Sequence, residues 1–154
     1  MNFDFTMTIV KHFIREMNMN ALRLKMSATS FDSPHGLSNR FNFSTAQDIC
    51  KLSMACMRIP RFREVVCTRK YTTKALNNEK SVYNWENTNK LLGKNDFWVG
   101  CKTGVTEPAG PCFSGFYEDI PNKNRYCVVV LSSKTMEQRW VEVPKMVKWA
   151  IKCK

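Results

Sequence analysis

The chain has 154 residues, 44% of them apolar and 12% aromatic, enough for one hydrophobic core but too few for two separate domains. The 24 Lys and Arg against 13 Asp and Glu give a formal net charge of +11, which attracts polyanions. These basic residues are scattered and no nucleic-acid-binding motif accompanies them, so we expect a solvated basic surface and no specific nucleic-acid partner. Charged residues interrupt the apolar stretches, which argues against a transmembrane segment.

Cysteine and histidine usage argues against a metal centre. The cysteines are odd in number and widely spaced, without a C-x-x-C pair or a paired His: Cys50, Cys56, Cys67, Cys101, Cys112, Cys127 and Cys153. This spacing is untypical of a zinc site or a disulfide framework, so we expect buried free thiols and neither a metal nor another cofactor. We interpret His12 as a helix-surface residue and His35, beside Pro34 and Gly36, as a turn-shaping residue.

The first third of the chain reads as two helices separated by an irregular connection. Apolar residues recur at helical spacing over residues 8–24, which predicts an amphipathic helix. Residues 27–42 are rich in Ser, Asn, Asp, Pro and Gly, and indicate a loop. The run from Ser44 to Gln47 has the form of a capping box with Ser44 as the cap, so a second helix is predicted from there to about Met57.

The middle of the chain is less regular. The run Arg58-Ile59-Pro60 is expected to end the second helix, and a short segment through Phe62 and Val66 is expected to follow it. An extended stretch is predicted over residues 67–73, followed by a turn at residues 77–80.

The last third predicts strands and a closing helix. Three strands are expected at residues 97–104, 112–117 and 126–131, and Pro-containing connections between them favour an antiparallel meander. Residues 136–153 predict an amphipathic helix despite Pro144 within it. The aromatic residues interpreted as packing side chains are Trp98, Trp140 and Trp149.

Several short motifs follow one another in a specific order. They are Met17-Asn18, Leu24-Lys25-Met26, Thr29-Ser30-Phe31, Pro34-His35-Gly36-Leu37, Ser44-Thr45-Ala46-Gln47-Asp48, Asn87-Thr88-Asn89-Lys90-Leu91-Leu92, Gly100-Cys101-Lys102-Thr103-Gly104, Ala109-Gly110 and Arg139. A lone Lys-Thr-Gly is common by chance, whereas the ordered set is specific. Over residues 17–149 the chain resembles the low-molecular-weight penicillin-binding proteins, the serine-type D-Ala-D-Ala carboxypeptidases of peptidase family S11 that trim peptidoglycan stem peptides.

The resemblance implies an α+β fold of the three-layer, β-lactamase/transpeptidase-like type, with an antiparallel sheet packed against N- and C-terminal helices. We expect residues 1–154 to form a partial domain of this kind, with residues 1–10 as a divergent start. In the family, further strands and the central helix precede the region matched here, and we expect them to be missing. Their loss predicts an exposed sheet edge and an unburied apolar face.

The resemblance also implies the site residues. The family's site combines a Ser-x-x-Lys, a Ser-x-Asn and a Lys-Thr-Gly. Lys102 is then the catalytic residue and makes the cleft electropositive, while Thr103 offers its hydroxyl to the terminal carboxylate of the substrate. Gly104 leaves room for the substrate backbone, and the N–H of Val105 is one of two oxyanion-hole donors. Lys102, Thr103, Gly104 and Val105 together are the implied substrate-binding residues, with no metal.

Three further expectations follow from the same resemblance. Lys134 lies where some relatives keep a basic residue near the substrate carboxylate. Strand alternation points Thr103 away from Lys102, so Thr103 needs a local distortion of the strand to reach the cleft. Lys25 stands where relatives usually have Gly at a helix end, so it must adopt a left-handed conformation or the helix cap must change.

The departures from the family bear on activity. No serine of the chain is followed by lysine three residues later, and neither Ser-x-Asn nor Tyr-x-Asn occurs. Without a nucleophile the acyl-enzyme cannot form, so we expect no carboxypeptidase activity from this polypeptide alone. Two interpretations remain. The chain is either a fragment of a serine D-Ala-D-Ala carboxypeptidase whose N-terminal half lies upstream in the gene or in a second chain, or a non-catalytic remnant that binds peptide or polyanion.

The start of the chain shows no recognisable targeting signal. Residues 1–10 lack a basic start and a clean apolar segment with a cleavage site, so no secretory signal is visible, although the family works outside the cytoplasm.

Overall fold

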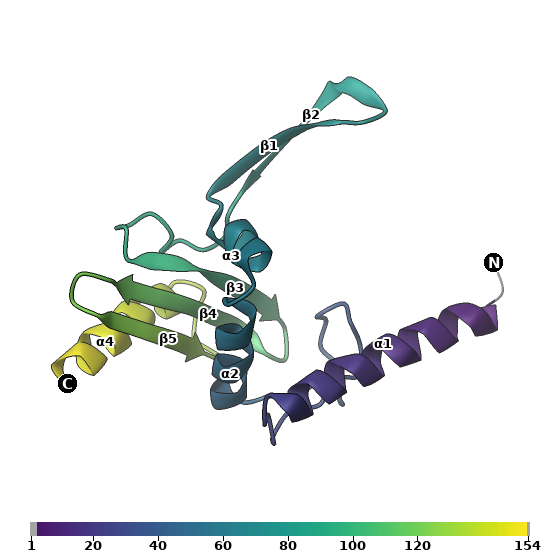
Figure 1. The fold of residues 1–154 in the computed structure, drawn as a ribbon, viewed down its shortest axis with the longest axis horizontal. Helices are drawn as coiled ribbons and strands as arrows, with labels where there is room; N and C mark the ends of the chain where they lie inside the picture. Colours follow the sequence, from purple (N-terminus) through teal and green to yellow (C-terminus); the bar gives the residue numbers. More distant parts are fainter. Residues whose placement is uncertain (1–2, 154) are drawn as a thin grey trace.

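The computed structural model describes residues 3–153, and residues 1, 2 and 154 lie outside the described part. Figure 1 shows a three-layered body from which a helix and a hairpin project. In chain order the elements are α1 (Phe3–Arg23), α2 (Ala46–Cys56), α3 (Pro60–Cys67), β1 (Lys70–Ala75), β2 (Asn78–Glu86), β3 (Trp98–Thr106), β4 (Gly110–Asp119), β5 (Asn124–Val130) and α4 (Gln138–Lys152).

A three-stranded antiparallel sheet of order β3-β4-β5 forms the middle layer, as the meander predicted from sequence requires. Alternate residues of β4 face opposite layers. The Phe113 ring packs edge-on against Trp140 of α4, whereas the Ser114 hydroxyl hydrogen-bonds Ser53 of α2 at 2.7 Å between the oxygens. The helices α4 and α2 therefore cover the two faces of the sheet, which confirms the expected three-layer α+β fold.

The hydrophobic core lies between the sheet and α4. Its buried members come from the segment before β3, from all three strands and from α4: Leu91, Trp98, Phe113, Val128, Trp140, Val143 and Val147. Trp98 and Trp140 are thus packing residues, as predicted. Trp149 is not, because 68% of its surface is exposed. It stands two positions after Val147, outside the helical spacing that joins Trp140, Val143 and Val147.

A hairpin of β1 and β2 forms a second sheet that projects from the body (Figure 1). Tyr71 pairs with Trp85, and the chain reverses between Ala75 and Asn78. The sequence predicted the first strand but placed a turn at residues 77–80, where β2 already begins. This prediction failed because most side chains of the hairpin are solvent-exposed on both faces, so no apolar alternation marks the second strand.

A helix cap and a short helix also differ from the predictions. The cap of α2 is Thr45, whose hydroxyl accepts a hydrogen bond from the Asp48 N–H at 3.2 Å, and not Ser44. The helix α2 does end before Arg58-Ile59-Pro60, but the short segment that follows is a helix that was not predicted. Pro60 begins this helix, α3, where a missing N–H costs nothing because the first helical N–H groups have no intrahelical partner.

The N-terminal helix α1 is longer than predicted and poorly covered. It begins at Phe3, so residues 3–10 of the expected divergent start are helical. Ile9 and Phe13, on the predicted apolar face, are each 54% exposed, whereas Ala21 near the other end is buried. The unburied apolar face expected from the sequence is therefore present. Lys25, just after the helix, has φ 57°, the left-handed conformation that was one of the two expected alternatives.

Within residues 3–153, no helix combines the length and apolar character that crossing a bilayer requires.

Candidate functional site

The Lys-Thr-Gly segment lies on β3, an edge strand of the three-stranded sheet. The pairing of β3 with β4 shifts between Val99 and Cys101, so Gly100 forms an irregularity just before Lys102. A side chain at Gly100 is impossible without rearrangement, since a Cβ there lies 2.5 Å from Val66 Cγ2 and 2.7 Å from the Val66 carbonyl oxygen. Close packing of α3 on the strand therefore dictates this glycine.

Thr103 is held by the segment that follows the hairpin. Its Oγ1 lies 2.7 Å from Oγ1 of Thr88 in a shared hydrogen bond. Thr88 is positioned by its neighbour Asn87, whose Nδ2 donates to the carbonyl oxygens of Val66 at 3.2 Å and Thr68 at 2.9 Å. The hydroxyl expected to meet the substrate carboxylate thus has a defined direction, set by a side chain that sequence reasoning did not single out as functional.

Lys102 and Gly104 are open to solvent. The Lys102 ammonium donates a hydrogen bond to the carbonyl oxygen of Thr103. A Cβ added at Gly104 meets no atom within 4 Å, and the backbone there does not have a positive φ. Neither packing nor backbone conformation therefore explains glycine at position 104, in contrast to position 100.

Arg139 of α4 hydrogen-bonds the backbone of β3 and of its neighbour β4. The side chain is buried, with 3% exposed, and its Nη1 donates to the carbonyl oxygens of Cys112 at 2.9 Å and Gly104 at 3.5 Å. Its guanidinium also lies 4.5 Å from the ring centre of Trp140. Within residues 3–153 the Arg139 Nε has no hydrogen-bond partner. Arg139 is a positioning residue that the motif alone did not reveal as such.

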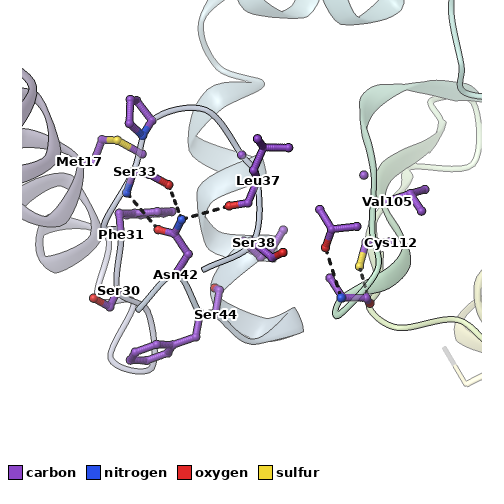
Figure 2. A pocket seen from close by; sticks show the side chains of 17 residues that line it. Met17, Ser30, Phe31, Ser33, Leu37, Ser38, Asn42, Ser44, Val105 and Cys112 are labelled. Atoms are coloured by element: carbon purple, nitrogen blue, oxygen red, sulfur yellow. Dashed lines mark hydrogen bonds between the residues drawn. The ribbon is translucent and has the colours of Figure 1, made fainter. Parts of the chain in front are cut away.

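An open pocket separates the end of β3 from the loop after α1 (Figure 2). Gly104 and Val105 line it from the sheet, and Val105 is 52% exposed. The opposite wall comes from the loop, for example from Phe31 and Asn42. Lys102 and Thr103 are not among the lining residues, so the structure brings two of the four expected site residues into this pocket and places the other two next to it on the same strand.

Side-chain hydrogen bonds hold the loop wall in place. Asn18 of α1 accepts from the Phe31 N–H at 2.9 Å and donates to its carbonyl oxygen at 2.7 Å. The Asn42 Oδ1 accepts from the Asp32 N–H at 2.6 Å, and its Nδ2 donates to the Ser33 hydroxyl at 2.5 Å. Residues 27–42 therefore form an ordered wall, although their sequence predicted only an irregular connection.

A carboxylate ties this wall to α2. Asp48 is buried and accepts from the Lys51 ammonium at 2.8 Å, the Ala28 N–H at 2.9 Å and the Thr29 hydroxyl at 2.9 Å. The hydrogen bond from Lys51, followed by those from Ala28 and Thr29, holds the pKa of Asp48 below its usual value against the opposing effect of burial.

The remaining candidates are not among the residues that line the pocket. Lys134 is exposed in the loop after β5, and His12 is exposed on α1. The His35 Nδ1 accepts from the Leu37 N–H at 3.0 Å, which is the turn-shaping role expected for it. No group of His, Cys, Asp and Glu suited to hold a metal ion occurs in the described part of the chain.

Cys101, next to Lys102, is unsuited to replace the serine. Burial raises the pKa of its thiol to about 11, so it is protonated at neutral pH and a poor nucleophile.

Known proteins are similar to this chain in sequence. The sequence profile of the D-alanyl-D-alanine carboxypeptidase family matches residues 7–135. A D-alanyl-D-alanine carboxypeptidase of Streptomyces sp. (strain K15) is 38% identical over 106 residues, which are 67% of this chain and 36% of that protein. A D-alanyl-D-alanine endopeptidase of Escherichia coli (strain K12) is 29% identical over 90% of this chain and 44% of its own length.

The solved structures agree. The crystal structure of the Streptomyces K15 DD-transpeptidase superposes with a TM-score of 0.84 at 31% identity, covering 92% of this chain and 55% of that one. The chain thus spans about half of the solved structure and less than half of the two curated relatives. The profile match, the fold and the Lys-Thr-Gly strand lead to one conclusion: this chain belongs to the D-alanyl-D-alanine carboxypeptidase family, peptidase family S11.

Proposed function

We propose that residues 1–154 are a partial domain of a serine D-Ala-D-Ala carboxypeptidase and contribute its Lys-Thr-Gly half-site. The substrate is a D-Ala-D-Ala peptide of the peptidoglycan type, and the reaction passes through an acyl-enzyme. In this proposal a polypeptide segment outside the 154 residues supplies the Ser-x-x-Lys and Ser-x-Asn, because neither motif occurs here.

In this proposal each residue of the Lys-Thr-Gly segment and the residue after it has its own task. The Lys102 ammonium lies in solvent next to Thr103 and attracts the terminal carboxylate of the peptide. The Thr103 hydroxyl, oriented by Thr88, donates to that carboxylate. The N–H of Val105 stabilises the oxyanion formed when the serine attacks the carbonyl carbon. Lys102 acts electrostatically and is not the nucleophile.

The observation that carries the proposal is the open space at Gly104. Gly100 is required by the packing of Val66, whereas nothing lies within 4 Å of a Cβ at Gly104. A glycine kept free of neighbours on an exposed edge strand suits the close approach of a ligand backbone. Arg139 binds the carbonyl oxygen of the same residue and so restrains the strand where the peptide lies.

The exposed apolar surface of this chain supports the proposal that a further polypeptide segment packs on it. The face of α1 at Ile9 and Phe13 is uncovered, and so is Trp149 on α4. Surfaces of this kind mark protein contacts. We infer that the segment bearing the serine packs on them, so that the nucleophile reaches the pocket beside Val105.

A fluorescent penicillin tests the proposal, because the reagent acylates the serine of this family's site. The 154-residue chain alone is expected to stay unlabelled, with denatured protein and an excess of unlabelled penicillin as controls. A chimera that joins the N-terminal segment of the Streptomyces K15 relative to this chain is expected to be labelled. In that chimera Lys102→Ala lowers the acylation rate by about 10²-fold or more.

Two outcomes contradict the proposal. Specific labelling of the folded chain alone reveals a nucleophile within it. A folded, labelled chimera in which Lys102→Ala acylates at the same rate as the parent shows that the Lys-Thr-Gly strand takes no part. Circular dichroism of each protein ensures that only folded samples are compared.

A further inference from the structure

Two cysteines distant in sequence face each other across α2 and β5. Cys50 lies on α2 and Cys127 on β5, 77 positions later. The Cys50 Sγ lies 4.0 Å from the carbonyl oxygen of Cys127, and the Cys127 Sγ lies 3.9 Å from the carbonyl oxygen of Cys50. Each sulfur therefore lies beside the other residue's backbone, which places the two side chains next to each other between α2 and β5.

The two thiols also interact directly and are accessible. Both residues are half-buried, and both line an open hollow beside Trp149 of α4. The hydrogen bond with Cys127 lowers the pKa of Cys50 to about 7 and raises that of Cys127. Cys50 is therefore the more readily ionised thiol of the pair, because a hydrogen bond from Cys127 stabilises its thiolate form.

We propose that Cys50 and Cys127 form a redox modification site, which exchange with a small-molecule disulfide converts into an intramolecular disulfide joining α2 to β5. This site is separate from the Lys-Thr-Gly strand and does not depend on the proposed peptidase function.

Glutathione disulfide can serve as the two-electron oxidant of this pair of thiols. The Cys50 thiolate attacks one sulfur of the disulfide, the S–S bond breaks, and one glutathione thiolate leaves. Cys127 then loses its proton and attacks the Cys50 sulfur of the mixed disulfide, which expels the second glutathione. Two protein thiols are oxidised by two electrons, and one glutathione disulfide is reduced to two glutathiones.

The other cysteines provide matched controls. Burial raises the pKa of Cys56 and raises that of Cys101 to about 11, so both thiols are poorer nucleophiles than Cys50. Cys153 is exposed near the end of α4 and can form bonds between molecules, so a Cys153→Ser background removes that reaction.

The test incubates the 154-residue chain in buffers of increasing glutathione disulfide, and maps disulfides by mass spectrometry of non-reduced peptides. We expect one linked pair of peptides containing Cys50 and Cys127. The link persists in Cys101→Ser and disappears in Cys50→Ser and Cys127→Ser. Oxidation should raise the thermal unfolding midpoint by on the order of 10 °C, because the bond closes a long loop, and dithiothreitol should reverse the rise.

Three results overturn the proposal: no Cys50–Cys127 peptide in folded, oxidised protein; preferential pairing of Cys101 with Cys56 or Cys67; or an equal rise of the midpoint in Cys50→Ser. The wild-type comparison of oxidised and reduced states needs no substitution, so it remains decisive even if a variant fails to fold.

Discussion

Thr88 and Thr103 share a hydrogen bond of 2.7 Å between their hydroxyl oxygens, which joins the segment after the hairpin to the Lys-Thr-Gly strand. Since Asn87 anchors that segment to the carbonyl oxygens of Val66 and Thr68, the end of α3, the base of the hairpin and β3 are linked at one place. The orientation of the Thr103 hydroxyl is therefore a property of three elements together.

Thr88→Ala should loosen this link without unfolding the protein. The pair is partly exposed, so we expect the free energy of unfolding to fall by about 0.5–1 kcal/mol. In a double-mutant cycle of Thr88→Ala with Thr103→Ala, measured by urea unfolding, the two effects should be less than additive. Thr88→Ser keeps the hydroxyl and is the control. Strictly additive losses would contradict a direct interaction.

Gly100→Ala and Gly104→Ala should differ sharply, although both lie on β3. At position 100 the new Cβ meets the backbone and side chain of Val66, so we expect a loss of about 1–3 kcal/mol in unfolding free energy. At position 104 the Cβ enters open space, and the change should stay within about 0.5 kcal/mol. Chemical denaturation of the two variants measures both.

Comparing Gly100→Ala with Gly104→Ala also distinguishes an effect on packing from an effect on function. In the penicillin-labelled chimera Gly104→Ala should slow acylation despite its unchanged stability, because the methyl group occupies the space proposed for the ligand backbone. Normal acylation by a stable Gly104→Ala variant would remove the main support for the proposed role of β3.

Arg139→Met should destabilise the chain more than a surface substitution. It removes the donor to the carbonyl oxygens of Cys112 and Gly104 while keeping much of the packing on Trp140. Losing the hydrogen bonds of this buried charged donor predicts a fall of about 2–3 kcal/mol in unfolding free energy, read from thermal or urea unfolding. The substitution Arg125→Met at an exposed position of β5 is the matched control and should change stability little.

The Asp48 carboxylate should make stability depend on acid pH. Its pKa is depressed in the folded chain, chiefly by Lys51, so its contribution is fully present above the unfolded value of 3.8 and is lost as pH falls through the lower folded value. Asp48→Asn should be less stable than the wild type at neutral pH and should lose less stability on acidification. NMR titration of Lys51→Met should show the Asp48 pKa moving back up.

Much of the architecture was predictable from local pattern. The three strands of the sheet have β-branched and aromatic residues between Pro- and Gly-containing turns, and α4 has a clear helical period, so both were correctly predicted. The hairpin strand β2 was missed because its exposed residues carry no burial pattern. The helix α3 was missed because a proline that follows the end of one helix can also begin the next.

By itself, the sequence determined the family, through ordered motifs, and placed the Lys-Thr-Gly on a strand, through turn residues and strand propensity. Only the tertiary structure decided that Thr88 orients Thr103, that Arg139 binds the backbone of β3, and that Gly104 is free where Gly100 is packed. Each of these depends on atoms that are far apart in the chain, and the distances between such atoms follow from the packing of whole elements, which no local pattern encodes.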